Sequence, residues 1–192
     1  YQALLIEGTT NDTSRMSMIR SSNDDNGPEI QIIKTRGTSV GSVTKPNQND
    51  YLGAFVFLAG DDSDLFTGGA EIGVQATGTP ANDRCPTDII FSTTPTSGAS
   101  TPQERLRINS SGHVTKPNQP SFHASRRAGD VSANNYITFD QVFHNNGSHY
   151  DNTNGRFTAP VTGVYFFSAW NFTGGTSCLL YTSDAADDLY RV

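Results

Sequence analysis

The sequence predicts an all-β protein, and three observations support that class. Its 192 residues include 18 Gly and 9 Pro, and Asn, Ser and Thr separate short apolar runs, a composition typical of strands joined by turns. Several of those runs alternate apolar and polar residues, as half-buried strands do. No window shows the 3.6-residue apolar spacing of an amphipathic helix. We therefore expect the first part of the chain to form a β-sandwich or an intertwined trimeric β-module.

Short apolar or alternating segments in the first region are the expected strands, about seven in number. The clearest alternation is at Ala70–Ala76, where Ala70, Ile72, Val74 and Ala76 share one face. The other segments are Ala3–Glu7, Arg15–Ser21, Glu29–Thr35, Tyr51–Ala59, Asp88–Thr93 and Glu104–Asn109.

A polar, proline-containing break divides the chain. The predicted units are a β-module over residues 1–110, a linker over 111–120, and a second module over 121–177. The linker should be extended, because each Pro restricts the residue before it. Its hexapeptide VTKPNQ also occurs at Val43–Gln48. A linker motif shared between modules and a chance repeat both account for this duplication.

Composition limits the possible partners. The net charge is −6 and hydrophobic residues make up 34% of the chain. No cluster of Lys and Arg exists to neutralise phosphates, so we expect no nucleic-acid partner. No run approaches the roughly 20 apolar residues of a membrane helix, so we expect no membrane insertion. The small apolar content indicates a core built partly between chains. The chain lacks an initiator Met, and we expect it to begin inside a longer protein.

The second region has a different pattern. Tyr136–Phe143 alternates, Arg156–Ala159 follows, and Gly163–Phe172 is dense in aromatic residues. In this last segment both faces are apolar, which favours a strand buried on both sides. We expect Val164, Phe166 and Trp170, which share one face, to pack in the core.

The second region resembles the start of a complement C1q-like domain, the jelly roll of tumour-necrosis-factor-like proteins. The resemblance covers about the first half of such a domain and implies a truncated jelly roll that forms homotrimers. It is carried by Phe122–Ala124, Ile137–Val142, Asn145–Gly147, Tyr150–Asp151 and, most strongly, Gly155–Phe167.

The first region resembles modules of phage tail fibres. The matching segments are Leu4–Gly8, Lys34–Gly37, Asp50–Gly53, Gly60–Asp62, Ala70–Ile72, Ile90–Thr94, Glu104–Ile108 and Gly112–Val114. The resemblance implies an extracellular structural and adhesion protein of a virion. Its partners would be other tail proteins and a glycan or protein of the host surface. A secreted or surface C1q-like adhesion protein of a bacterium is the alternative, followed by a polysaccharide depolymerase.

Catalytic and metal-binding residues are not predicted. The candidate carboxylates are Asp61, Asp62, Asp64, Glu71 and Glu104, and the first three fall in one turn-like loop. A glycosidase needs two carboxyl groups placed across a sugar, whereas such a loop is typical of a solvated turn or occasionally a Ca²⁺ loop. The histidines, His113, His123, His144 and His149, lack a His-x-His pair, and Cys85 has no evident His partner. We expect no enzyme activity and no cofactor.

A candidate receptor-contact loop lies in the second region. Its amide and aromatic side chains suit sugar recognition by hydrogen bonding and stacking. A plain hairpin turn accounts for the same composition. The candidate residues are Asn145, Asn146, His149, Tyr150 and Asn152.

The last residues, 178–192, differ in character. CLLYTSDAADD, at Cys178–Asp188, resembles a translated sequencing-library adapter. We therefore expect this tail to be non-native and Cys85 to be a lone thiol. The other interpretation is a short helix-permissive tail over Asp184–Leu189.

Overall fold

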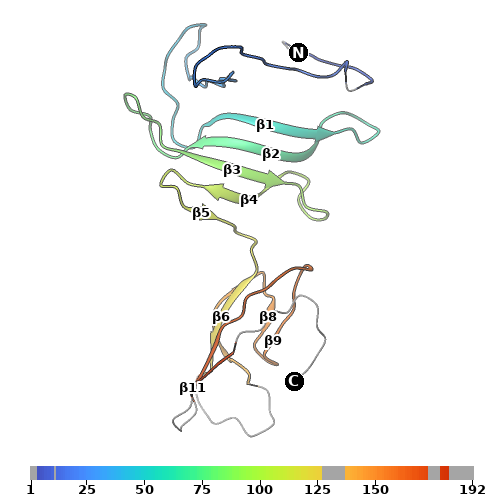
Figure 1. The fold of residues 1–192 in the computed structure, drawn as a ribbon, viewed down its shortest axis with the longest axis vertical. Helices are drawn as coiled ribbons and strands as arrows, with labels where there is room; N and C mark the ends of the chain where they lie inside the picture. The colour runs from blue at the N-terminus through green and yellow to red at the C-terminus, as the bar shows by residue number, and fades with distance from the viewer. Residues whose placement is uncertain (1–3, 11, 127–136, 173–177, 182–192) are drawn as a thin grey trace. The chain divides into compact units, whose positions relative to one another are not determined.

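The all-β prediction is confirmed by the computed structural model (Figure 1). It describes residues 4–10, 12–126, 137–172 and 178–181, the last four and residues 170–172 by their backbone. Every regular element among them is a strand. None of the described residues lies in a helix that could span a membrane. The chain divides between Val114 and Thr115 into two units, called unit 1 and unit 2 below.

Unit 1 is built on one antiparallel sheet. Its strands are β1 (Tyr51–Ala59), β2 (Thr67–Ala76), β3 (Thr87–Thr93), β4 (Gln103–Ile108) and β5 (Val114–Thr115). They follow one another across the sheet in the order of the sequence (Figure 1). Short turns rich in Gly, Pro and Asp make this meander possible, since antiparallel neighbours need only a tight connection.

The strand register separates the two faces of this sheet. Phe55, Ile72, Phe91 and Leu106 lie opposite one another along successive strands, so they share one face. We call this side the apolar face; it also carries Phe57, Val74, Ile89 and Ile108. The opposite face carries Glu71, Gln75, Asp88, Ile90 and Arg107. A second sheet that would make a sandwich is not found among the described residues of unit 1.

Three predicted strands of the first region are corrected by the structure. The described parts of Ala3–Glu7, Arg15–Ser21 and Glu29–Thr35 form no regular strand. Their alternation of apolar and polar residues is real, but a strand also needs a neighbour for its backbone hydrogen bonds. Within the described part of one chain, these segments have no such neighbour.

Unit 2 consists of short antiparallel ladders. β6 (Ser121–Ser125) pairs with β7 (Gln141–Asn146), β8 (Tyr150–Asp151) pairs with β9 (Arg156–Phe157), and β10 (Ala169–Phe172) pairs with β11 (Cys178–Tyr181). Over the residues described, the ladders remain separate two-stranded sheets. The structure thus places Cys178–Tyr181, the start of the tail predicted to be non-native, in a strand. The origin of residues 178–192 stays a prediction.

The predicted core of the second region is wrong for two of its residues. Val164 is 78% exposed and Phe166 is 83% exposed, and the Trp170 side chain lies outside the described residues. Tyr165 and Phe167 instead turn inward against Phe157. Phe166 makes a single β-bridge and regular strand begins only at Ala169, so residues 164–168 form no regular strand.

Candidate functional site

A cluster of aromatic rings forms the interior of unit 2. Phe122 from β6 stacks on Tyr150 from β8, with 4.5 Å between ring centroids and 1° between planes. Phe157 and Phe167 lie on the same Phe122 ring, at 5.6 and 6.1 Å. Tyr150 is only 5% exposed, and its hydroxyl donates to the Phe139 carbonyl and accepts from the Phe139 N–H. The cluster therefore fixes the loop that precedes Tyr150.

That loop holds the predicted receptor-contact residues, and its backbone forms a tight turn. The Ser148 N–H donates to the Asn145 carbonyl at 3.3 Å, and Gly147 and Ser148 both adopt positive φ. The Asn145 amide donates to the Tyr150 carbonyl and accepts from the Tyr150 N–H, at 2.8 and 3.1 Å. This side chain thus imitates a strand backbone, as Asn often does in turns.

The remaining loop residues differ in how much of each side chain is free to contact a ligand. The Asn146 amide donates to the carbonyls of Pro117 and Gln119, at 2.8 and 2.6 Å. His149 places its ring edge-on to Phe157, with 6.3 Å between centroids. Asn152 is exposed and donates to the Asp140 carbonyl at 3.3 Å. The structure brings the five candidates together, and His149 and Asn152 keep exposed surface, while Tyr150 is buried. Receptor contact by this loop stays a prediction.

Sequence analysis missed an exposed aromatic pair on the β6–β7 ladder. His123 and Phe143 lie 4.9 Å apart between ring centroids, and both are exposed. Strand alternation could have found His123, because its neighbour Phe122 points into the cluster and successive side chains point to opposite faces. The two ring planes are tilted by 32°, and exposed rings of this kind suit the stacking of an apolar sugar face.

Three of the five candidate carboxylates, Asp61, Asp64 and Glu104, are occupied by structural contacts. The Asp61 carboxylate accepts from the Ser63 hydroxyl, the Asp64 N–H and the Thr67 hydroxyl, at 2.6, 3.0 and 2.8 Å. These hydrogen bonds, the Ser63 hydroxyl first, hold the pKa of Asp61 well below its usual range. Asp64 accepts from the Phe66 N–H. The loop is a self-contained turn, and such an acidic group stays ionised rather than supplying a proton near neutral pH.

An ion network lies on the face of the unit 1 sheet opposite the apolar face. Arg107 donates to Asp88 at 2.7 Å and to both Glu104 oxygens. Asp88 is 5% exposed and also accepts from the Ser110 N–H. These carboxylates, Glu104 first, raise the pKa of Arg107 further above its already high value. Arg107 thereby joins β4 to β3 through Asp88, and Glu104 is engaged by Arg107 rather than free to act as a catalytic acid.

The histidines do not gather into a metal site. His113 faces the Asn109 amide at 3.4 Å, and the His144 ring shares a hydrogen bond of 2.8 Å with the Ser121 hydroxyl. Across the described ranges, no three His, Cys, Asp or Glu side chains come together as metal ligands would.

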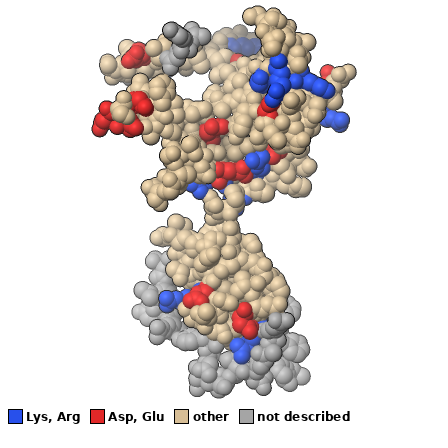
Figure 2. Space-filling view, turned by 180° about the vertical axis from the view of Figure 1, so that it is seen from behind, with Lys and Arg blue, Asp and Glu red and all other residues tan. Residues whose placement is uncertain are grey.

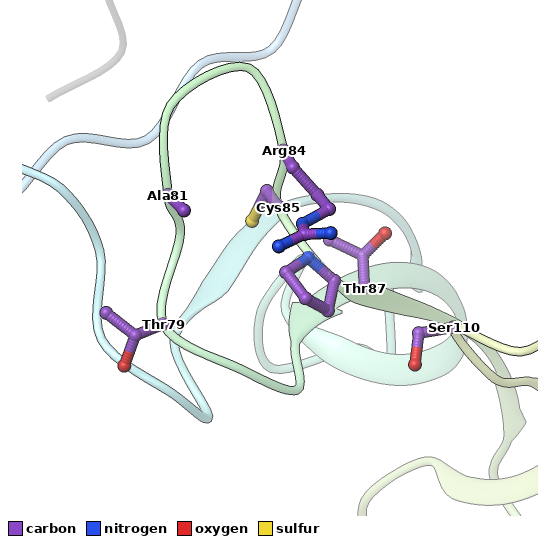
Figure 3. A pocket seen from close by; sticks show the side chains of 7 residues that line it. Thr79, Ala81, Arg84, Cys85, Thr87 and Ser110 are labelled. Atoms are coloured by element: carbon purple, nitrogen blue, oxygen red, sulfur yellow. The ribbon is translucent and has the colours of Figure 1, made fainter.

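A hollow of about 480 Å³ lies in unit 1 beside Cys85. Figure 3 shows Arg84, Cys85 and Thr87 at one end of the loop, Ala81 and Thr79 on its other arm, and Ser110 on a neighbouring segment. Cys85 is an exposed free thiol. The lining offers one cation and several hydroxyls but no base beside the thiol, which a nucleophilic Cys requires.

Charged side chains do not form one large patch on the face shown in Figure 2. Small groups of acidic and basic residues lie apart, and wide uncharged areas separate them. This distribution offers no extended basic surface to a polyanion on that face.

Comparison with known proteins identifies one part of the chain. Residues 121–184 match the family model of the C1q domain, so the resemblance of the second region is confirmed. Complement C1q tumor necrosis factor-related protein 6 of Rattus norvegicus is 36% identical over 76 residues, and that of Mus musculus is 34% identical. The alignments cover 36% of this chain and 29% of these relatives. The chain thus spans less than a third of the curated relatives it matches.

A solved structure offers a weaker likeness. The carboxy-terminal domain of the bacteriophage T5 L-shaped tail fibre aligns with a TM-score of 0.46 and 12% sequence identity. The alignment covers 64% of this chain and 46% of that one. A score at this level establishes no common fold, so the tail-fibre resemblance of the first region stays a prediction.

Proposed function

We propose that this chain is a structural and adhesion component of a phage tail fibre. It acts as a homotrimer, in which unit 1 forms part of the stalk and unit 2 is the start of the receptor-binding head. The match of residues 121–184 to the C1q domain carries the proposal. The phage origin is supported by the resemblance of most of residues 3–114 to tail-fibre modules.

A binding role fits the side chains better than a catalytic one. The carboxylates of Asp61 and Glu104 are engaged in turns and ion pairs, so neither is placed to act on a sugar. In contrast, unit 2 presents an aromatic pair, His123 and Phe143, and partly exposed polar groups at His149 and Asn152. Exposed rings and amides hold a glycan by stacking and hydrogen bonding without chemistry.

The test combines assembly, binding and turnover on the full chain. Sedimentation equilibrium should give three times the monomer mass, and a glycan array should show ligands that are lost in Phe143→Ala. Surface polysaccharide incubated with the protein should keep its chain length. A monomer at micromolar concentration would exclude the trimeric fibre, and shortened polysaccharide would favour a depolymerase.

An alternative is a secreted or surface C1q-like adhesion protein of a bacterium. It is favoured by the curated relatives, which are cellular rather than viral proteins. The genes beside this one decide between the two: tail and baseplate genes support the fibre, and their absence supports the cellular protein.

A further inference from the structure

The apolar face of the unit 1 sheet is open to solvent in the single chain. Phe55 and Phe57 on β1 are 52% and 56% exposed, and Ile89 on the central strand β3 is 39% exposed. Ile72, Val74, Phe91, Leu106 and Ile108, the other large members of this face, are half-buried. Not one of its large apolar side chains is fully buried, whereas sheets in folded proteins cover at least one face.

On the central strand β3 the opposite face is the better covered one, although on β1 Val56 of that face is 53% exposed. Ile90 is 4% exposed there, and Asp88 is shielded within its ion network with Arg107. On β3, the side of the sheet with polar and charged residues is thus shielded from solvent. The side with more apolar side chains is left exposed. This inversion indicates that the apolar face has a partner outside the chain.

The chain itself supplies little cover. Ile32 lies so close to Gly53 that a β-carbon on Gly53 would sit 2.3 Å from the Ile32 Cγ2 atom. Gly53 marks one end of the apolar face, since it pairs with Val74. Phe55, Phe57 and Ile89 remain exposed despite this contact.

The chain exposes more area than a folded monomer of its mass, and the almost wholly exposed residues 4–10 and 12–50 contribute to this excess together with the apolar face. The chain exposes 16035 Å² for a mass of 20.7 kDa, whereas a folded monomer of that mass exposes ~9,000 Å². Even if all residues outside the described ranges were fully extended, they would account for only ~4,700 Å². The exposed area left after both amounts are subtracted is larger than the area that two neighbouring chains would cover. Two contacts of standard size remove roughly 1,600 Å² from one chain.

We infer that the apolar face of unit 1 packs against the same face of further copies of this chain. The inference rests on the homotrimer of the proposed function and assigns its contact surface outside the residues that match the C1q domain. The paired positions of this face carry no charged residue. Arg105, at the bulge of β4, reaches this face by donating to the Thr93 hydroxyl at 3.0 Å. Copies that pack here would therefore have to keep this cation at the solvated rim of the contact, away from its counterparts. Three such faces turned to a common axis would enclose one apolar core.

The position of β1 supports the same partner. β1 is nine residues long and lies at the edge of the sheet, and its Phe55–Leu58 segment is exposed on both sides. A long apolar edge strand on a free monomer is an aggregation hazard. Packing within a closed trimer would reduce that hazard, because it covers the Phe55 and Phe57 side chains.

Thiol labelling of the full chain tests this assignment. Cys85→Ser and Cys178→Ser remove the native thiols. Phe57→Cys and Ile89→Cys then place single thiols on the apolar face, and Val56→Cys places one on the opposite face. Val56 is the matched control because it is next to Phe57 and is 53% exposed in the single chain. A water-soluble maleimide is applied at a concentration where sedimentation shows the wild type to be trimeric.

The expected result is that thiols at positions 57 and 89 react at least about tenfold more slowly than the thiol at position 56. Loss of the trimer in Phe57→Cys but not in Val56→Cys would also support the apolar face as the contact between copies. Equal labelling rates within an intact trimer would overturn the inference and leave the proposed function standing. A wild-type chain that is monomeric throughout would overturn both.

Discussion

Units 1 and 2 both have a small hydrophobic core, but they are stabilised by different contacts. Unit 1 has a continuous five-stranded sheet, yet Ala76 and Ile90 are its only fully buried hydrophobic residues among those described. Unit 2 has short ladders, but its Phe122 ring gathers Tyr150, Phe157 and Phe167 into one cluster. Regular backbone hydrogen bonding and a packed interior are therefore separate properties. Unit 1 has more of the first, and unit 2 has more of the second.

This difference predicts where each unit is vulnerable. Unit 2 should depend on side-chain packing within one chain, since its rings contact one another. Unit 1 should depend on its hydrogen-bonded sheet, on its ion network, and on contact with other copies. Substitutions that affect only one unit test this division.

The largest effect is expected from Tyr150→Ala. The change removes a buried ring stacked on Phe122 and two hydrogen bonds to Phe139, so unit 2 should lose about 3–5 kcal/mol of stability. Hydrogen exchange of β6 and β7 amides measures this loss, and β2 and β3 amides should keep their protection. Tyr150→Phe is the control, and it should cost about 1–3 kcal/mol because it leaves the Phe139 backbone groups without their partner. Equal loss of protection in β2 and β3 would contradict the independence of the units.

A smaller effect is expected in unit 1 from Arg107→Met. This change leaves the Asp88 carboxylate, 5% exposed, without its cation. We expect a cost of about 1–3 kcal/mol, measured as urea-dependent exchange of β3 and β4 amides. Arg15→Met is the matched control, because the Arg15–Asp12 pair is exposed and should cost about 0.5 kcal/mol or less. Similar costs for both variants would show that the network does not stabilise the sheet.

Phe166 and Phe167 give a test within one segment of unit 2. Phe167 packs on Phe122 and Phe157, whereas Phe166 is 83% exposed. Phe167→Ala should cost about 1–3 kcal/mol, and Phe166→Ala should cost about 0.5 kcal/mol or less. Thermal unfolding of the two variants at equal concentration measures the difference. A larger loss for Phe166→Ala would show that another chain covers this residue.

These examples show how far the sequence could predict the fold. Alternation found β1 to β4, because those strands pair with neighbours close in the chain. It failed for residues 15–21 and 29–35, which have no strand partner in the described part of the chain. It also assigned Phe166 to the core, because alternation separates two faces but does not show which one is covered.

The repeated hexapeptide VTKPNQ shows a second limit of local sequence. In the first copy the turn runs from Asn47 to Asp50, and the Asp50 carboxylate pairs with Arg36. In the second copy Val114 and Thr115 form β5, and the turn runs from Lys116 to Gln119. The same residues therefore turn at different points, because residues after the hexapeptide and distant partners select the turn. The contacts of Asn145 and Asn146 with Tyr150, Pro117 and Gln119 were unpredictable for the same reason.

The smallest expected effect is one that the two units share. Asp61 in unit 1 and Asp151 in unit 2 each begin a turn in which the carboxylate accepts from the N–H and hydroxyl of the residue two places on, Ser63 or Thr153. These hydrogen bonds lower the pKa of both carboxyl groups below the ordinary 3.8. Because the folded pKa is depressed, the turns contribute stability above pH 3.8 and lose it as the pH falls through the folded pKa.

Carbon-13 NMR of the side-chain carboxyls should therefore give titration midpoints below 3.8 for Asp61 and Asp151. Thr67→Val should raise the Asp61 midpoint, since it removes a hydroxyl that donates to that carboxylate at 2.8 Å, and it should leave Asp151 unchanged. The cause lies within a few residues of each Asp, so the midpoints should be the same in monomer and trimer. A midpoint that moves with protein concentration would mean that one turn contacts a neighbouring chain. In that case the two units would also differ in their loops, because the turn of one unit would contact another chain and the turn of the other unit would contact solvent.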